Sequence, residues 1–399
     1  MSLENIKSEF PLLESDPGLV YLDNAATTQK PRRVIDALTG FYGKSNANIH
    51  RGVYPLAESA DRIYDGARKI VAEFVGAEPE QIIFTKNATE GANLLAFGIG
   101  EAMVRPGDNL IVTELEHHAN YLPWQEMAKR RGAELRIWPL DIKTKELQTG
   151  WLEMNLDTRT KVVAVTMMSN VLGNGPDLTS IVSTAHQQGA LVVADAAQWV
   201  AHKQVNFRGT GVDAAFFTGH KIYGPMGTGI VYISAELAEK IPPMLTGGGM
   251  IMDLPDKWFE SPTKFEAGTP DVAGIAGLVE AIGFLRKIGW EKLAEHERSL
   301  AADMWDMLIA KPRVRLLLPD KKDLGSILAF EVEGIHPHDL ASVLAEDKIC
   351  VRAGHHCAKP LLYRLGVKAV TRISLGVYNR AGDVEAVETS LEKAFKLFS

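Results

Sequence analysis

Two stretches of the sequence decide the fold: Leu191-Val-Val-Ala-Asp195-Ala-Ala-Gln198 and Asp213-Ala-Ala-Phe-Phe-Thr218-Gly-His220-Lys221. Each contains a short apolar run that ends abruptly in polar residues, which is typical of a strand buried on both faces of a parallel sheet. In open α/β sheets, ligands bind outside the carboxyl ends of the strands. We therefore expect Asp195 and Lys221 to lie at one edge of the sheet, on neighbouring strands.

A carboxylate and an amine in this arrangement are what a pyridoxal phosphate (PLP) site requires. The amine forms an imine with the cofactor aldehyde, and the carboxylate keeps the pyridinium nitrogen protonated, so that the ring can accept electrons. A structural ion pair at the edge of the sheet would place the same residue types together. Asp195 and Lys221 alone leave both interpretations open.

The composition is ordinary for a globular enzyme. The chain has 399 residues, 46% hydrophobic and 23% charged, and its net charge is −7 without a basic block. This length suits two domains, and the charge gives no sign of binding to nucleic acid or to an anionic membrane. The first ten residues lack the apolar segment of a secretory signal, and no apolar run approaches the ~20 residues of a membrane span. Two cysteines make no disulfide framework, so we expect a cytoplasmic protein.

Strands and helices alternate from about residue 80 to residue 235, which predicts a doubly wound sheet. Beside the two quoted strands, apolar runs predict strands at residues 81–85, 109–113, 134–138, 160–166 and 230–233. Helical periodicity predicts helices at about residues 31–42, 56–74, 181–188, 272–287 and 290–311.

The turn at Asn87-Ala-Thr89-Glu90-Gly91 follows the first of these strands and precedes a helix. Free backbone N–H groups and a hydroxyl at a helix N-terminus form a ready anion site. An ordinary N-cap would explain Thr89 equally well. The glycine pattern G-x-G-x-x-G is missing here, which argues against a Rossmann dehydrogenase.

From about residue 313 the pattern changes to short strands at 314–318 and 327–331 that alternate with helices at 337–346 and 381–397. This predicts a separate α+β domain, joined through the long helix at about 290–311.

Four further positions are candidates for chemistry. His117 and His118 end a strand; neighbouring residues point apart, so a ring that stacks on a flat cofactor explains one of them better than a metal site. Cys357 follows Arg352-Ala-Gly-His355-His356, and neighbouring cations lower the pKa of a thiol; a Cys–His metal site or an inert thiol are the alternatives. Arg372 lies inside a short strand, where a guanidinium is costly unless it binds a carboxylate.

The sequence resembles the cysteine desulfurases, PLP enzymes of fold type I also called class V aminotransferase-like, and especially their group-II branch of the SufS and CsdA type. The motifs that carry the resemblance run nearly end to end and keep the order of the family: Tyr21-Leu-Asp-Asn-Ala-Ala, Asn48-Ile-His-Arg-Gly, Thr89-Glu-Gly, Glu116-His-His-Ala-Asn, Ser169-Asn-Val-Leu-Gly, Thr218-Gly-His-Lys, Phe265-Glu-Ala-Gly-Thr-Pro, Arg352-Ala-Gly-His-His-Cys and Arg372-Ile-Ser.

The resemblance implies an α/β fold with a large PLP-binding domain at residues 26–285, built on a mostly parallel seven-stranded sheet. It also implies a small α+β domain at residues 286–399, with residues 1–25 packed against that small domain.

The resemblance further implies a role for each matching position. Lys221 would bind the cofactor covalently, His117 would stack on its ring, Asp195 would pair with the ring nitrogen, and Gln198 would bond its phenolic oxygen. The phosphate would be held by Thr89, Thr218 and His220, with Thr269 reaching in from a second subunit. Asn170 and Arg372 would bind the substrate carboxylate, Cys357 would accept the sulfur, and the pocket would be lined by His50, Arg51, Arg352 and His355. No metal is expected.

The implied reaction converts L-cysteine to L-alanine and leaves a persulfide on Cys357. A sulfur-acceptor protein would carry the sulfur toward iron–sulfur cluster or cofactor assembly, and the shared site implies a homodimer. Three alternatives are a selenocysteine lyase with the same site, another PLP reaction such as an aminotransferase, which needs no thiol, and a non-enzymatic sulfur-transfer scaffold. The sequence departs from the family pattern at Asn87, Ala88 and Ala196, which puts one phosphate contact and the packing under the ring in question.

Overall fold

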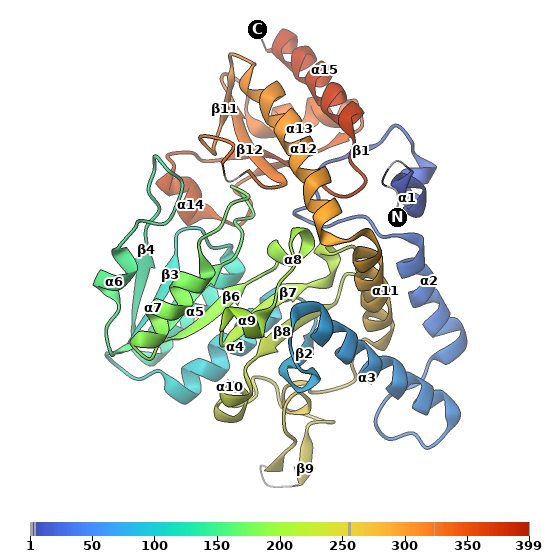
Figure 1. The fold of residues 1–399 in the computed structure, drawn as a ribbon, viewed down its shortest axis with the longest axis vertical. Coiled ribbons are helices and arrows are strands. Elements are labelled where there is room, and N and C mark those ends of the chain that lie inside the picture. The colour runs from blue at the N-terminus through green and yellow to red at the C-terminus, as the bar shows by residue number, and fades with distance from the viewer. Residues whose placement is uncertain (1–2, 4, 254–256, 323, 399) are drawn as a thin grey trace.

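A mixed sheet of seven strands forms the centre of the computed structural model, which describes residues 3, 5–253, 257–322 and 324–398 (Figure 1). In spatial order the strands are β2 (Ile82–Thr85), β8 (Gly229–Ile233), β7 (Ala214–Thr218), β6 (Leu191–Asp195), β5 (Thr160–Thr166), β3 (Asn109–Thr113) and β4 (Glu134–Trp138). β8 runs antiparallel to β2 and β7, and the other neighbours are parallel. The predicted α/β fold with a mostly parallel seven-stranded sheet is confirmed, and the carboxyl ends of every strand except β8 share one edge.

Helices cover both faces of this sheet, which explains why its central strands are apolar throughout. Successive residues of β3 point to opposite faces: Leu110 and Val112 join one apolar cluster, and Ile111 joins the other. The first cluster includes α4 (Ala88–Met103), α5 (His118–Arg131) and α10 (Ala235–Lys240). The second includes α3 (Pro55–Val75), α7 (Leu178–Gln187), α9 (Phe207–Thr210) and α11 (Val272–Ile288).

A second, antiparallel sheet is built from the C-terminal part of the chain, above the large sheet in Figure 1. Its strand order is β11 (Val314–Leu316), β12 (Ile327–Val332), β15 (Val370–Ser374) and β14 (Arg352–Gly354). It shares a separate apolar cluster with α12 (Trp290–Ile309), α13 (Pro337–Glu346) and α15 (Ala381–Leu397). α14 (Lys359–Arg364) follows the loop after β14.

The N-terminal segment touches both parts of the molecule. After a short turn (Ile6–Glu9) and α1 (Pro11–Ser15), β1 (Val20–Tyr21) pairs in parallel with β13 (Ile349–Cys350). Phe10 packs edge-on against Phe284 of α11 and Tyr378 of the C-terminal part, with ring centroids 5.5 and 4.7 Å away. The domain boundaries at residues 25 and 285 stay predictions.

The remaining elements are short: α2 (Arg32–Gly40) with the turn Phe41–Ser45, α6 (Trp151–Asn155), α8 (Trp199–His202), the hairpin β9 (Ile251–Asp253) and β10 (Lys257–Trp258), and 3₁₀ turns at Pro79–Gln81, Gly219–Lys221 and Thr263–Phe265. Among the helices of the described residues, none is both long and apolar enough to cross a membrane.

Candidate active site

A cavity of about 300 Å³ opens at the shared edge of the large sheet, where β6 and β7 end. Asp195 is the last residue of β6, and Thr218 is the last residue of β7, directly before the turn that carries Lys221. The predicted site residues that line this cavity are Thr89, His117, Asn170, Asp195, Gln198, Thr218, His220, Lys221, Arg352, Cys357 and Arg372. The chain thus brings one amine, one carboxylate, one thiol and two guanidiniums to a single hollow.

Burial sets the charge balance between Lys221 and Asp195. Burial lowers the pKa of Lys221 from 10.5 to about 8, although the nearby Asp195 carboxylate acts in the opposite direction. Burial raises the pKa of Asp195, against a hydrogen bond of 2.9 Å from the Ala197 N–H to its Oδ1 and the charge of Lys221. Below pH 8, Lys221 is therefore an ammonium beside a buried carboxylate, and above pH 8 it is a neutral amine, which is a nucleophile.

His117 is held at the cavity as the N-cap of α5. Its Nδ1 accepts a hydrogen bond of 3.1 Å from the Ala119 N–H, so the ring proton of the neutral form resides on Nε2. Burial lowers the pKa of His117 to about 3, and the charges of Lys221 and other nearby cations add to that effect. The ring is neutral at ordinary pH and suits stacking on a flat, electron-poor ring.

The N-terminus of α4 provides an anion site at the same cavity, lined by Asn87, Ala88 and Thr89. The N-cap is Asn87, whose side chain accepts from the Glu90 N–H at 2.9 Å, so Thr89 is not the cap. Thr89 is therefore not explained as an ordinary N-cap, and its hydroxyl is available to a ligand. A 16-residue helix with free N–H groups at this end favours a phosphate.

Several buried polar atoms at the cavity have no hydrogen-bond partner among the described residues. They are Gln198 Oε1, His220 Nδ1, Asn170 Oδ1 and Arg372 Nε. Buried polar groups are nearly always satisfied in native proteins, so their concentration around one cavity indicates a polar ligand. Gln198 Nε2 donates to Ala25 O at 2.9 Å and has a second hydrogen for a ligand acceptor. This donor and acceptor set fits PLP.

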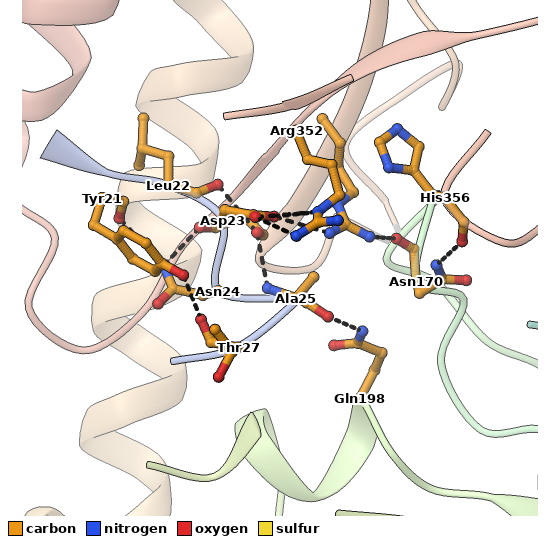
Figure 2. A network of polar contacts seen from close by, with 12 residues as sticks. Tyr21, Leu22, Asp23, Asn24, Ala25, Thr27, Asn170, Gln198, Arg352 and His356 are labelled. Carbon is orange, nitrogen blue, oxygen red and sulfur yellow. Dashed lines mark hydrogen bonds and ion pairs between the residues drawn. The ribbon is translucent and has the colours of Figure 1, made fainter. Parts of the chain in front are cut away.

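Arg372 and Arg352 form the cationic wall of the cavity and share one carboxylate, that of Asp23. Figure 2 shows Arg352 in contact with Asp23. Arg372 is only 2% exposed; its Nη1 donates to Asn170 O at 2.9 Å and its Nη2 donates to Asp23 Oδ1 at 3.1 Å. Burial lowers the pKa of Arg372 to about 10, while Asp23 raises it, so the guanidinium stays charged at neutral pH. A buried cation whose Nε–H has no partner among the described residues suits a substrate carboxylate.

The loop that carries Cys357 is fixed against the start of α5. Cys357 O accepts from the His118 N–H at 2.7 Å, and His118 Nε2 accepts from the Lys359 N–H at 3.3 Å. His356 and Cys357 both have positive φ, 50° and 54°, a conformation that non-glycine residues keep only when surrounding contacts enforce it. The thiol is exposed and already lines the cavity with Lys221.

The other predicted site residues lie outside this cavity. Thr269 lines a separate cavity of about 210 Å³ beside Glu266 and Lys86, and its predicted reach into a second subunit stays a prediction. His50 and Arg51 are exposed on the loop before α3, where the His50 N–H donates to Asp61 Oδ1. His355 supports the thiol loop instead of lining the cavity, because its Nδ1 accepts from the Cys357 N–H at 3.1 Å.

Sequence reasoning assigned no role to four residues that the structure places at or beside the site. Asp23 holds both arginines, and His356 lines the cavity with its Nε2 bonded to Val370 O. Glu116, next to His117 in the sequence, is fully buried and accepts hydrogen bonds from Thr113, Asn120 and Thr166. Lys30 donates to the carbonyl oxygen of His220 at 2.9 Å. Asp23, Glu116 and His356 lie in motifs quoted above, which was the available signal.

The structure shows the surroundings of the three residues that depart from the family pattern. Asn87 is extended, with φ −172°, and its side chain caps α4. Ala88 lines the cavity without a hydroxyl, and Ala196 is fully buried with its N–H donated to Phe216 O at 3.0 Å. In the described part of the chain, no group of three or more His, Cys, Asp or Glu side chains could hold a metal.

Comparison with known proteins shows similarity along the whole chain. The aminotransferase class-V family matches residues 20–387. A probable cysteine desulfurase of Streptomyces coelicolor is 41% identical, covering 100% of this chain and 98% of that protein. A cysteine desulfurase of Cronobacter sakazakii is 40% identical, covering 99% of each. The crystal structure of the Escherichia coli cysteine desulfurase CsdA superposes with a TM-score of 0.93 at 35% identity, covering 100% of both chains. The predicted resemblance and the fold type I architecture are confirmed.

Proposed function

Because the chain belongs to the class-V aminotransferase family, we propose that it is a PLP-dependent cysteine desulfurase that moves the sulfur of L-cysteine onto Cys357 and releases L-alanine. The single observation that carries this function is that Lys221, Asp195, Arg372 and Cys357 line one cavity. An aminotransferase would need the first three groups only, whereas an exposed thiol in the same cavity supplies a nucleophile for sulfur.

PLP would be held by residues from several elements. Lys221 Nζ would bind its aldehyde carbon, Asp195 its ring nitrogen, and Gln198 Nε2 its phenolic oxygen, while the ring of His117 would cover one face. Thr89, Thr218, His220 and the N-terminus of α4 would hold the phosphate, with Thr269 of a second subunit completing the cradle. When bound, PLP supplies an electron sink for a negative charge on the substrate α-carbon.

The substrate carboxylate would bind Arg372 and Asn170. Arg372 Nε and Asn170 Nδ2 come from β15 and from the loop after β5, and Asn170 is fixed by its bond of 2.8 Å to His356 O. The substrate α-carbon would then lie between Lys221 and the thiol loop. Arg352, which is half exposed at the mouth, would complete the wall facing the substrate.

Two groups of the chain would carry out the chemistry. Lys221 Nζ in its neutral form would take the α-proton of the substrate, and the low pKa of the amine favours that form. The Cys357 thiolate would attack the substrate sulfur: a sulfur–sulfur bond forms and the substrate carbon–sulfur bond breaks. The electron pair of that bond stays with the three-carbon fragment, which takes up protons and leaves as L-alanine. Cys357 then holds a persulfide, which a thiol of an acceptor protein can remove.

The partners and the cellular place belong to the same proposal. A cytoplasmic homodimer would supply Thr269 to each site, and His50 and Arg51, exposed in one chain, would line the pocket of the other. The outward position of Cys357 makes its persulfide accessible to a sulfur-acceptor protein, for delivery to iron–sulfur cluster or cofactor assembly.

Purified protein tests the function directly. We expect near-visible absorbance from bound PLP, L-alanine release from L-cysteine, and a mass increase of one sulfur atom on the peptide containing Cys357. L-selenocysteine is assayed in parallel, because its selenol fits the same groups, and a ratio that strongly favours it would identify a selenocysteine lyase. Transamination of L-cysteine without alanine would identify an aminotransferase and overturn the proposal.

A further inference from the structure

We propose that Asp23 is a positioning and specificity residue of the carboxylate site: it occupies the two arginines as an internal carboxylate and limits the site to one substrate carboxylate. This inference rests on the proposed function, because it concerns how the same cavity binds its substrate. The proposed binding of cofactor, substrate and sulfur gives Asp23 no role.

The geometry gives Asp23 an unusual number of cationic contacts. Arg352 Nε lies 3.1 Å from both carboxylate oxygens, Arg352 Nη2 lies 2.9 Å from Oδ2, and Arg372 Nη2 lies 3.1 Å from Oδ1. The side chain of Asp23 is 14% exposed, against 2% for Arg372 and 50% for Arg352. One carboxylate therefore links the buried guanidinium of Arg372 to the half-exposed guanidinium of Arg352.

The backbone fixes Asp23 in this place from both sides. Asp23 forms a parallel bridge with Ser374 of β15, and the Ser374 N–H donates to Leu22 O at 2.7 Å. On its other side, Asn24 Nδ2 donates to Ser374 O at 2.8 Å, and the Ala25 N–H donates to Ser374 Oγ at 2.9 Å. The backbone at Asp23 is thereby tied to the strand that carries Arg372.

The side chains of Arg352, Arg372 and Asp23 together carry a net charge of one positive unit. Arg352 and Arg372 contribute two, and Asp23 cancels one of them. A site with this balance is matched by one carboxylate of an amino acid, and Arg372 Nε is the buried donor still without a partner among the described residues. Asp23 also takes up Arg372 Nη2, which a substrate carboxylate would otherwise bind. It therefore weakens the binding of substrate and product alike, which favours release of L-alanine.

The test is the affinity of the loaded enzyme for L-alanine, measured by spectral titration without turnover. Asp23→Asn keeps the shape and removes the charge. We expect the dissociation constant to fall at least about fivefold at low salt, because two carboxylates about 4 Å apart repel each other by roughly that factor even at the dielectric constant of bulk water. High salt should shrink the difference. Asp23→Glu keeps the charge and should stay within about twofold of wild type. Asp16→Asn is the matched control, since Asp16 lies in the same segment and pairs with Lys348 away from the cavity.

Calorimetric titration of propionate into protein without PLP gives an independent readout, in which Asp23→Asn should again bind more tightly than wild type. An unchanged or higher dissociation constant in Asp23→Asn would overturn the inference, and so would an equal change in Asp23→Glu. Wild-type protein that releases no L-alanine from L-cysteine would instead refute the proposed function, so the two failures are distinguishable.

Discussion

Lys221 should react with PLP at a pH where ordinary lysines are inert. Burial lowers its pKa from 10.5 to about 8. At pH 7 about one amine in ten is then neutral, compared with about one in three thousand for an unperturbed lysine, so the reactive fraction is about 300-fold larger. Because only the neutral amine forms an imine, this factor carries directly into the rate of cofactor uptake.

The assay follows the near-visible absorbance after PLP is mixed with protein freed of cofactor, over a series of pH values. A group with a lowered pKa loses its proton early as the pH rises, so the rate should climb about tenfold per pH unit below pH 8 and level off above it. Borohydride trapping and peptide mapping assign the product to Lys221, and Lys221→Ala is the blank. Asp195→Asn removes the charge that raises the pKa of Lys221, so the plateau should begin at lower pH.

A rate that keeps climbing through about pH 9 toward the ordinary lysine range would refute the reasoning, because it would mean that burial does not control the protonation of Lys221. A profile that does not change in Asp195→Asn would show that the two groups do not interact.

Two further perturbations test the substrate wall and the scaffold. Arg372→Lys keeps the charge but loses the forked geometry of the guanidinium, so KM for L-cysteine should rise at least about tenfold in steady-state kinetics. The absorbance spectrum of bound PLP should not change. Glu266 accepts from both Arg68 Nη atoms, from the Tyr64 hydroxyl and from the Phe84 N–H, and it is 10% exposed. Glu266→Gln should lower the free energy of unfolding by about 3 kcal/mol in urea, whereas Glu58→Gln in an exposed pair should change it by less than about 0.5 kcal/mol; equal effects would contradict the assignment.

The position of the site was predictable because buried parallel strands appear in the sequence as short apolar runs. Apolar runs that end in Asp195 and Thr218 require no long-range information, and the parallel arrangement places both ends at one edge. The antiparallel direction of β8 leaves no such trace, since an apolar run reads the same in both directions. α5 is also hard to predict, because Pro123 lies inside it.

The partners of the arginines could not be predicted, because they lie far away in the sequence. Asp23 and Arg372 are 349 positions apart, and the bridge between the N-terminal segment and β15 brings them together. His356 lines the cavity in place of the predicted His355, and the cause is local. Two consecutive residues with positive φ, His356 and Cys357, change the direction of the chain. Residue types alone do not reveal such a turn.

The thiol at position 357 is the feature that separates a desulfurase from other PLP enzymes. Cys357→Ala in the purified, PLP-loaded protein is therefore the decisive measurement, with Cys350→Ala as the matched control, because Cys350 is the other free cysteine and lies in β13. We expect Cys357→Ala to keep the near-visible absorbance and its response to added L-cysteine, but to release no L-alanine, while Cys350→Ala turns over normally. Alanine release by Cys357→Ala at the wild-type rate would show that the sulfur leaves the substrate without this thiol.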